Sequence, residues 1–504
     1  MFGLKKALPA RYVVCILGFF GLFNVYAMRI NLSVAIVAMV KEPPRNISAT
    51  DSDVTCSELI DRSADPPING TWMEDKRPPR GEFEWDSTVQ GQVLGSYFYG
   101  YIITQVPSGV LAEKYGAKWV LGLGMLLCSI LTLLTPLAAR WSVWALVATR
   151  VLEGFGAGMA FPAMNALIGR WAPKMERSRI TTVIFMGCPI GTVLTLAISG
   201  VLCDSGFLGG WPSVFYLFGV IGCLWFVAWT WLVHDAPETH PSITQEELQH
   251  IQLGQDREIV QKPIVPWKSI LTSLPVWTLV VAHFGKNWGF YTILIQLPMY
   301  LSNILHFNLK KNGVLSAAPH LVMSLGSVVA SVAADKLRKS GRLKNTTIRK
   351  IFNSIGFFGA ATCLIVVSYS GCRPLLIMTM LILCMGLSGS SNAGYTVTHV
   401  DMSPQYAGTL YGITNCFANI TGFLVPAYVG WIVKDGQTIE RWGYIFVTSS
   451  IMLYVTGIFY DVFCSAELQS WGKTTPRDAC AQEMESVETS AHRKQAPRVL
   501  VCKD

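Results

Sequence analysis

Charged side chains are scarce in this sequence. Asp, Glu, Lys and Arg make up only 14% of its 504 residues, whereas soluble globular domains carry about 25%. Hydrophobic residues account for 51%, and the mean hydropathy is +0.40. Cores of ordinary size cannot hide that much apolar surface. The composition excludes a set of soluble domains, the 11% of aromatic residues excludes a disordered chain, and a multi-pass membrane protein remains.

Catalytic and metal-binding motifs are missing as well. The sequence has no His-Glu-x-x-His, no Asp-rich run and no paired-His motif, and its polar stretches are too short for a catalytic domain. We therefore expect no enzyme, no resident cofactor or metal, and no nucleic-acid partner. Most of the 13 cysteines lie within apolar runs. Cys56, Cys203 and Cys372 are predicted to face outward, where one pair could form a disulfide.

Twelve apolar runs are long enough to cross about 30 Å of hydrocarbon as helices of about 20 residues. They lie near 12–40, 88–112, 119–138, 143–169, 181–203, 211–233, 274–304, 313–334, 351–370, 375–398, 407–433 and 442–464. This pattern predicts an all-α membrane protein with two bundles of six helices. The expected divisions are a cytosolic tail (1–11), a first bundle (12–233), a cytosolic linker (234–272), a second bundle (273–466) and a disordered cytosolic tail (467–504).

Lys and Arg gather in alternate short loops, which by the positive-inside rule places both termini in the cytosol. The long loop 41–87 then lies outside or in a lumen, where its sequons at Asn46 and Asn69 could be glycosylated. In the linker, Thr244 stands three residues before Glu247, a capping-box pattern that predicts a short surface helix.

The two halves repeat each other. Gly91 precedes Glu113 by 22 positions, and Gly313 precedes Asp335 by the same number. The intervals from Pro173 to Gly191 and from Pro404 to Gly422 are both 18. Span two therefore matches span eight and span five matches span eleven, so the halves have the parallel topology of a two-bundle transporter.

The segment 109–121, Gly-Val-Leu-Ala-Glu-Lys-Tyr-Gly-Ala-Lys-Trp-Val-Leu, resembles the signature loop between spans two and three of the major facilitator superfamily. Its glycines permit a tight turn, while its acid and lysines could pair across helix ends and latch the inner side shut. The alternative is a basic loop that only sets orientation. The residues expected in the latch are Gly109, Glu113, Lys114, Gly116 and Lys118.

Four charges stand out inside predicted spans, where a charge costs roughly 2.5–3.5 kcal/mol without a partner or a water-filled cavity. They are Arg29, Arg150, Glu153 and Lys286. Three cations and one carboxylate predict an anion site, and Glu153 could exchange a proton that couples to the substrate. The alternative is a structural Arg150–Glu153 pair, with the other two cations reaching toward the membrane surface. Weaker candidates for lining the same cavity are Tyr97, Tyr101, Asn392 and Asn415.

Several longer segments are similar to the anion/phosphate solute carriers, the family of sialin, the vesicular glutamate transporters and the type I sodium/phosphate cotransporters. They are 26–37, 100–107, 171–179, 287–291 and 399–415, and the resemblance covers about 11–471. It implies a twelve-helix facilitator that moves organic anions by alternating access, with Arg29 and Arg150 at the positions of the substrate-binding arginines.

The sequence departs from the branches of that family at three positions. Ala157 and Asn165 stand where sialin has a second acid and a histidine, and Leu94 stands where the glutamate transporters have a histidine. The short N-terminal tail shows no acidic dileucine signal, so the plasma membrane is favoured over a lysosomal or vesicular one.

The leading interpretation is an ion-coupled secondary transporter of small organic anions such as sialate or glutamate, driven by H⁺ or Na⁺ and working as a monomer in the bilayer. A sodium-dependent inorganic phosphate cotransporter is the alternative within the same class. An anion channel, which could use the same buried cations, is the alternative from a different class.

Overall fold

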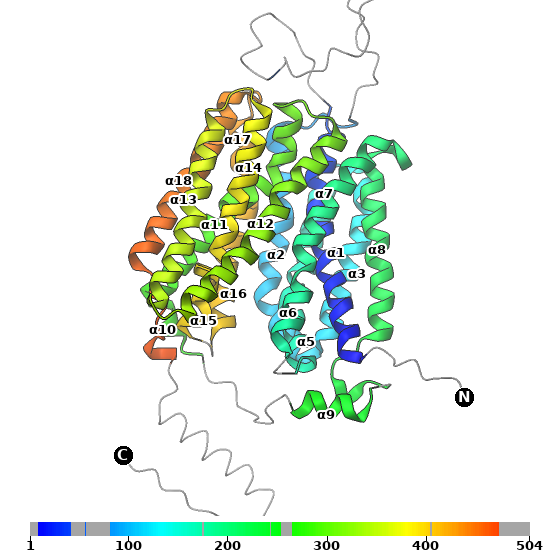
Figure 1. The fold of residues 1–504 in the computed structure, drawn as a ribbon. Helices are drawn as coiled ribbons and strands as arrows, with labels where there is room; N and C mark the ends of the chain where they lie inside the picture. The colour runs from blue at the N-terminus through cyan, green and yellow to red at the C-terminus, as the bar shows by residue number, and fades with distance from the viewer. Residues whose placement is uncertain are drawn as a thin grey trace, which may run out of the picture.

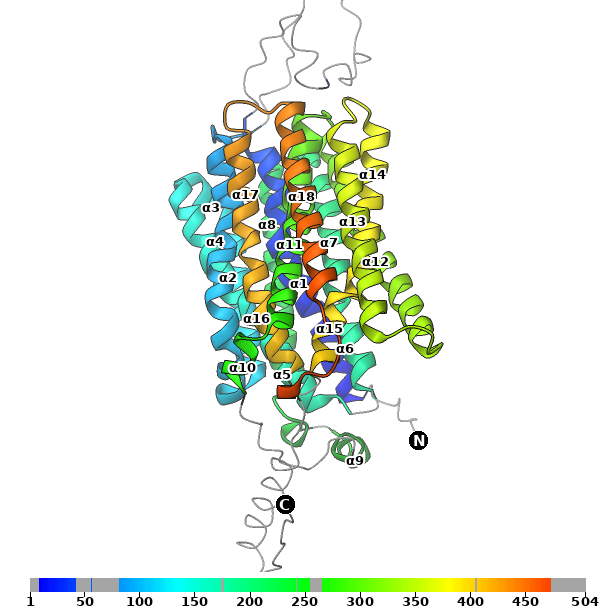
Figure 2. The ribbon, with the colours of Figure 1, turned by 90° about the vertical axis from the view of Figure 1, so that its left-hand side faces the viewer.

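The computed structural model describes residues 9–41, 56, 81–173, 176–241, 243–253, 265–403 and 406–472. Its long helices stand side by side in two groups (Figures 1 and 2). The first group contains α1 (Ala10–Met39), α2 (Ser87–Tyr115), α3 (Ala117–Trp141), α4 (Val143–Gly158), α5 (Ala160–Trp171), α6 (Arg177–Phe185), α7 (Gly187–Ser205) and α8 (Trp211–Leu232). The second contains α11 (Leu274–Asn303), α12 (Leu309–Lys339), α13 (Asn345–Ser368), α14 (Pro374–Ser388), α15 (Tyr395–Met402), α16 (Ala407–Asn419), α17 (Thr421–Ile432) and α18 (Ile439–Phe463).

These helices make the twelve predicted spans, because α4–α5, α6–α7, α14–α15 and α16–α17 are each one span interrupted by a short irregular step. Among the described residues, nine spans are long and apolar enough to cross a membrane by composition alone. The other three are α2, α11 and the α16–α17 pair. All three contact the opposite half of the molecule, α2 with α17 and α16, and α11 with α1.

Short polar residues begin four of the spans. Asp86, Ser142, Asn308 and Thr438 each accept a hydrogen bond from a main-chain N–H in the first turn of the helix that follows. Such N-caps satisfy donors that the helix itself leaves unpaired. All four mark the same end of the molecule, the end that holds Val40 and Ser87 and that we call the outer end. The opposite end, where α1 begins and α18 finishes, is the inner end (Figure 1).

Equivalent glycines close the outer end. A Cβ atom on Gly91 of α2 would lie 2.4 Å from the carbonyl oxygen of Pro426 in α17, and one on Gly313 of α12 would lie 2.5 Å from that of Leu196 in α7. Only glycine permits backbones to approach this closely. The repeat inferred from the sequence therefore corresponds to two matching contacts between the halves, span two on span eleven and span eight on span five.

The inner end is open. A Cβ atom added to Gly408 or Gly412, in the inner half of α16, would meet no described atom within 4 Å. The ring of Tyr411 packs 5.5 Å from the rings of His283 and His399, so it points into the bundle, yet the residue is 43% exposed. Solvent thus reaches the interior from this side, and the structure is in an inward-open arrangement.

A disulfide joins the halves outside the helices. Cys56 in the loop after α1 bonds Cys372, which lies between α13 and α14, and the Cys56 N–H also donates to the carbonyl of Ile304 at 3.2 Å. Of the three cysteines predicted to face outward, these two form the pair, while Cys203 is a buried free thiol. The sequons at Asn46 and Asn69 lie outside the described residues.

The linker contains the predicted short helix, α9 (Gln245–Leu253). Only one of the two hydrogen bonds of a capping box is present at its start: the Thr244 hydroxyl accepts from the N–H of Glu247 at 3.2 Å. The Glu247 carboxylate does not return to Thr244 but accepts from the N–H groups of Ala10 and Arg11, both at 3.0 Å, and so caps α1. This long-range contact competes successfully with the local one because the first turn of α1 offers unpaired donors.

The structure describes the first six residues of the tail predicted to be disordered from residue 467. The Gln469 N–H donates to the carbonyl of Met402 at 3.0 Å, and the 3₁₀ turn η6 (Ser470–Gly472) follows. The ring of Trp471 is partly buried and packs at an angle near that of Tyr406, with centroids 6.5 Å apart, which holds this segment against the bundle. Residues from 473 onward lie outside the described part of the chain.

We expect Gly91→Val to weaken the outer closure by about 1–3 kcal/mol, because the added side chain overlaps the backbone of α17. The outward-open population should rise. A cysteine introduced at Ser33, in a background without other reactive thiols, should then react faster with an impermeant thiol reagent added from the outer side. Gly412→Val is the matched control, and equal labelling of the two variants would contradict this assignment.

Because the Cys56–Cys372 disulfide joins the two halves, we expect them to stay covalently linked after the linker between them is cut. With a protease site inserted between residues 254 and 264, cleavage should give two fragments that migrate together until a reductant is added. Cys56→Ser should separate them without reductant, whereas Cys203→Ser should leave them linked. Fragments of the wild-type sequence that separate without reductant would rule out the bridge.

Candidate functional site

Arg29 lies in the middle of the molecule inside a set of aromatic rings. Its guanidinium carbon is between 4.7 Å and 5.9 Å from the ring centroids of Phe98, Tyr291, Tyr26, Tyr101 and Tyr97, which we call the aromatic cage. The residue is 7% exposed. Aromatic faces attract a cation, and more strongly when water is excluded. The cage therefore holds the charge in place without neutralising it.

The hydrogen bonds of Arg29 cross between the halves. Its guanidinium donates to the hydroxyl of Tyr291 in α11, and that hydroxyl donates to Oδ1 of Asn419 in α16 at 2.8 Å. Nε of Arg29 is buried without a hydrogen-bond partner, and Arg29 forms no ion pair among the described residues. Arg29 thus retains both an uncompensated charge and a free donor, the two properties that an anion site needs.

Arg150 and Glu153 form a buried ion pair, as their i, i+3 spacing allows. Nη1 of Arg150 donates to Glu153 at 2.5 Å and to the carbonyl of Met28 at 3.1 Å, and Nη2 donates to the carbonyl of Arg29 at 3.1 Å. The other oxygen of Glu153 accepts from Thr132 and Thr135. The hydrogen bonds from Arg150 to these two carbonyls connect α4 to α1 and hold the main chain at Arg29 in position.

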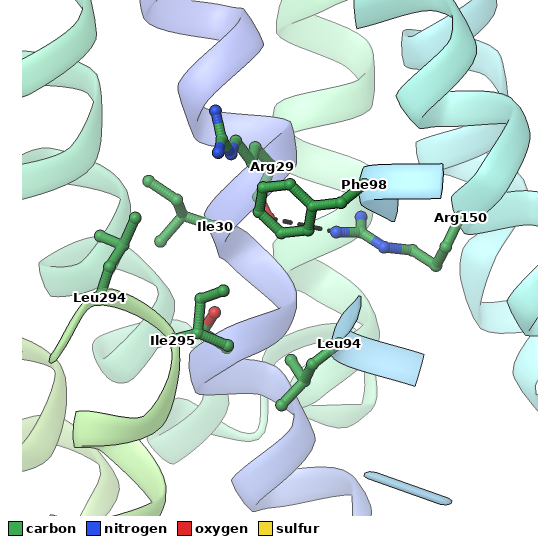
Figure 3. Close-up of a pocket in the computed structure, with 8 residues that line it drawn as sticks. Arg29, Ile30, Leu94, Phe98, Arg150, Leu294 and Ile295 are labelled. Carbon is green, nitrogen blue, oxygen red and sulfur yellow. Dashed lines mark hydrogen bonds between the residues drawn. The ribbon is translucent and has the colours of Figure 1, made fainter. Parts of the chain in front are cut away.

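A small cavity separates the two arginines. It has a volume of about 10 Å³, room for roughly one water molecule, and is lined by Arg29, Ile30, Ser33, Leu94, Phe98, Arg150, Leu294 and Ile295. Figure 3 shows the Arg150 side chain extending toward α1, with its bond to the Arg29 carbonyl drawn as a dashed line, while the Arg29 side chain points away from Arg150. Its walls come from both halves, so any relative motion of the halves changes its size.

Tyr97 and Tyr101 lie beside Arg29. Their rings stack 6.2 Å apart on one face of α2 and belong to the aromatic cage. The hydroxyl of Tyr97 is buried without a hydrogen-bond partner. It is a second polar group in this region that remains free for a ligand.

Lys286, Asn392 and Asn415 make other contacts. Nζ of Lys286 donates to Ser388 of α14 at 2.6 Å, and no carboxylate pairs with it in the described structure. The side chain of Asn392 donates to Ser327 in α12, away from the aromatic cage. The carbonyl of Asn415 accepts from Asn419 one turn later. The structure therefore brings Arg29, Tyr97 and Tyr101 together and leaves these three outside the cage.

The signature loop is held within the first half. Gly116 has φ +95°, and Asp235 fills the space beside it. Asp235 also accepts from the Lys118 N–H at 2.9 Å and pairs with Arg170 at 3.3 Å. Lys118 Nζ donates to the carbonyl of Thr230 at 2.9 Å. The side chain of Glu113 lies outside the described residues, Lys114 stacks on Tyr115, and Gly109 faces Pro162.

Sequence reasoning missed Tyr291, the group that connects Arg29 to the second half. It lies five residues after Lys286 on α11 and therefore on a different face of the helix. A polar aromatic residue in one of the least apolar spans was the available signal. Phe98 and Tyr26 were missed too, since cage rings look like ordinary apolar residues in a sequence.

Two six-helix bundles with repeated topology, closed at one end, open at the other and meeting at a buried unpaired cation, define a membrane transporter that works by alternating access. The chain belongs to the Major Facilitator Superfamily, whose family model matches residues 12–426. It is a multi-pass membrane transporter and not an enzyme.

Relatives confirm the expected branch. Human sialin is 40% identical over 462 residues, covering 92% of this chain and 90% of sialin. Human vesicular glutamate transporter 2 is 36% identical over 480 residues, 94% of this chain and 77% of the relative. A Drosophila melanogaster protein provisionally named an inorganic phosphate cotransporter is 40% identical over 473 residues, 93% and 87% of the two chains.

Solved structures agree on the fold. A bacterial homologue of the human lysosomal transporter Spinster, in an inward-facing unoccupied conformation, matches with a TM-score of 0.68 at 15% identity, covering 93% of this chain and 100% of that one. The inward-open xylose transporter XylE of E. coli gives 0.60 at 13% identity, covering 88% and 95%.

Glu153→Gln should destabilise the protein by about 3–5 kcal/mol, because it leaves the Arg150 charge buried without its counter-charge. Asp435→Asn removes the acid of the exposed Arg441–Asp435 pair and should cost under about 1 kcal/mol. Thermal unfolding of the purified proteins in detergent measures both. Equal melting temperatures would show that the Arg150–Glu153 pair does not stabilise the first half.

Proposed function

We propose that this protein is a secondary active transporter of small organic anions with a carboxylate group, of the sialate or glutamate type. The observation that carries the proposal is Arg29, a buried guanidinium with a free donor and no acid partner among the described residues. A planar guanidinium grips a carboxylate through two parallel bonds. The names of sialin and vesicular glutamate transporter 2 support an organic anion.

Lys286 gives the second half its own unpaired cation. An anion bound near Arg29 touches the Tyr291 link, and Lys286 on the same helix increases the positive potential there. Inorganic phosphate is the second candidate, favoured by the provisional name of the Drosophila relative. Phosphate suits the same guanidinium geometry, so competition between the two classes of anion decides between them.

Coupling to H⁺ or Na⁺ forms part of the proposal. Protonation of Glu153 would free Arg150 to share the substrate, and the loop from Gly109 to Lys118 would latch the inner side when it closes. We place the protein in the plasma membrane, acting as a monomer, with Asn46 and Asn69 glycosylated on the outer side.

Arg29→Ala should raise the KM for the transported anion by about 10- to 150-fold, the equivalent of about 1.5–3 kcal/mol for a charge-assisted hydrogen bond. Arg29→Lys keeps the charge but loses the fork and should recover only part of the uptake. Radiolabelled N-acetylneuraminate, glutamate and phosphate are the probes, in proteoliposomes with imposed ion gradients.

The exposed Arg338→Ala serves as the matched control and should transport at the wild-type rate. Uptake by Arg29→Ala at the wild-type rate would overturn the anion-site assignment. Accumulation against a concentration gradient separates a transporter from a channel, since a channel only equilibrates its ion.

A further inference from the structure

Two histidines in the second half share a single hydroxyl group. Nδ1 of His283 in α11 lies 3.1 Å from Oγ1 of Thr414 in α16, and Nε2 of His399 in α15 lies 2.9 Å from the same oxygen. Both histidines are almost fully buried, at 3% and 1% exposure. Neither contacts the Arg150–Glu153 pair. We call these three residues the histidine relay.

The contacts of His399 determine where its hydrogen atoms lie. Nδ1 faces the carbonyl oxygens of Tyr395 and Thr396 at 3.1 Å and 3.0 Å. Carbonyls only accept, so Nδ1 carries a hydrogen, and in neutral His399 the other nitrogen is an acceptor. Thr414 must then donate its one hydrogen to His399, and its oxygen accepts from His283.

A proton added to His399 reverses this arrangement. Nε2 then becomes an N–H that donates to the Thr414 oxygen, and the hydroxyl must turn away. Its alternative acceptor is the carbonyl of Tyr411, 3.1 Å away. A single protonation thus reverses the direction of the hydrogen bond between α15 and α16, turns the hydroxyl to the Tyr411 carbonyl, and makes the oxygen accept from two imidazoles instead of one.

Solvent comes close to the relay. The ring of Tyr411 lies 5.5 Å from each imidazole and is 43% exposed on the side that opens inward. One side chain therefore separates the relay from the inner solution. Protons can enter from water there in the inward-open state.

The charges around the relay disfavour an imidazolium in the empty transporter. Lys286 is one turn from His283 on α11, where i and i+3 side chains are neighbours.

The other titratable groups near the relay supply no free negative charge. The Asp401 carboxylate on α15 pairs with Arg349 of α13 at 2.6 Å. The remaining titratable neighbours are the phenols of Tyr395 and Tyr411. The ring of His320 in α12 packs against that of Phe290, with centroids 5.8 Å apart. Among the described groups, no free carboxylate faces the histidine relay.

An anion changes that balance. When a substrate carboxylate neutralises the positive field of Arg29 and Lys286, protonation of the relay becomes less costly, and by linkage a protonated relay strengthens anion binding. We propose that His283, Thr414 and His399 form a proton-binding site in the second half that couples the entry of one proton to the binding of the anion. This inference rests on the proposed function and makes the relay the proton-coupling group in place of Glu153, which stays paired with Arg150.

The test compares two variants of Thr414 that differ in whether the side-chain hydroxyl is present. Thr414→Val keeps the shape but removes the hydroxyl, whereas Thr414→Ser keeps it. In proteoliposomes with radiolabelled N-acetylneuraminate, glutamate and phosphate tried in turn, an imposed gradient of one pH unit should let the wild type accumulate its anion about tenfold, as expected for one proton per anion. Thr414→Ser should do the same, and Thr414→Val and His399→Gln should accumulate none.

Counterflow exchange without a pH gradient is measured on the same vesicles, because exchange needs binding and reorientation but no net proton movement. Thr414→Val should retain exchange, which shows that it folds and binds. Proton uptake on anion binding, read with a pH indicator in detergent, should be present in the wild type and absent in His399→Gln even if vesicle insertion fails.

Accumulation of the anion by Thr414→Val at the wild-type level under the pH gradient would show that the histidine relay is not the proton-binding site. Wild-type exchange with no response to the pH gradient would also overturn it while leaving anion transport intact. Absence of both exchange and accumulation for every probe would instead refute the proposed function, and the relay with it.

Discussion

The structure depends on a guanidinium that is buried without an acid. Arg29 is held by aromatic faces and by the Tyr291–Asn419 link, which position a charge but leave it unneutralised. Such a group is costly in the membrane interior, so the rest of the first half is built to hold it. Arg150 donates to the carbonyls of Met28 and Arg29 while Glu153 cancels its charge. One cation is neutralised by an acid, and the other keeps its charge and an unpartnered donor.

The hydrogen bonds from Arg29 to Tyr291 and from Tyr291 to Asn419 also join the two halves, so binding at Arg29 affects the contact between them. Tyr291 and Asn419 belong to the second half, so the hydrogen bonds of Arg29 depend on the position of one bundle relative to the other. At the outer end the bundles meet through glycines that repeat across the pseudo-symmetry, Gly91 on Pro426 and Gly313 on Leu196. At the inner end the halves are open to solvent. An anion that takes the donors of Arg29 competes with Tyr291 and thereby acts on the contact between the bundles.

Much of this arrangement was accessible from the sequence. Twelve apolar runs predicted the spans to within a few residues, and the scarcity of charge directed attention to Arg29, Arg150 and Glu153. What the sequence could not show were contacts between distant residues. Tyr291 is 262 positions from Arg29, and cage rings are indistinguishable from lipid-facing ones before the helices are packed. The same holds for Asn392, a polar residue within a span whose partner proved to be Ser327.

Unneutralised charge also explains why transport should be coupled. With its outer contacts closed, the empty transporter must carry Arg29 and Lys286 through an occluded state in which neither charge reaches water, and each costs roughly 2.5–3.5 kcal/mol by insertion scales. An anion removes much of that cost, so loaded reorientation is easier than empty reorientation. A proton taken up at the same time adds positive charge that only a bound anion can offset. Electrostatics then disfavours movement of either ion by itself, and in the proposed transport cycle this is what makes uptake of the proton at the histidine relay depend on the anion.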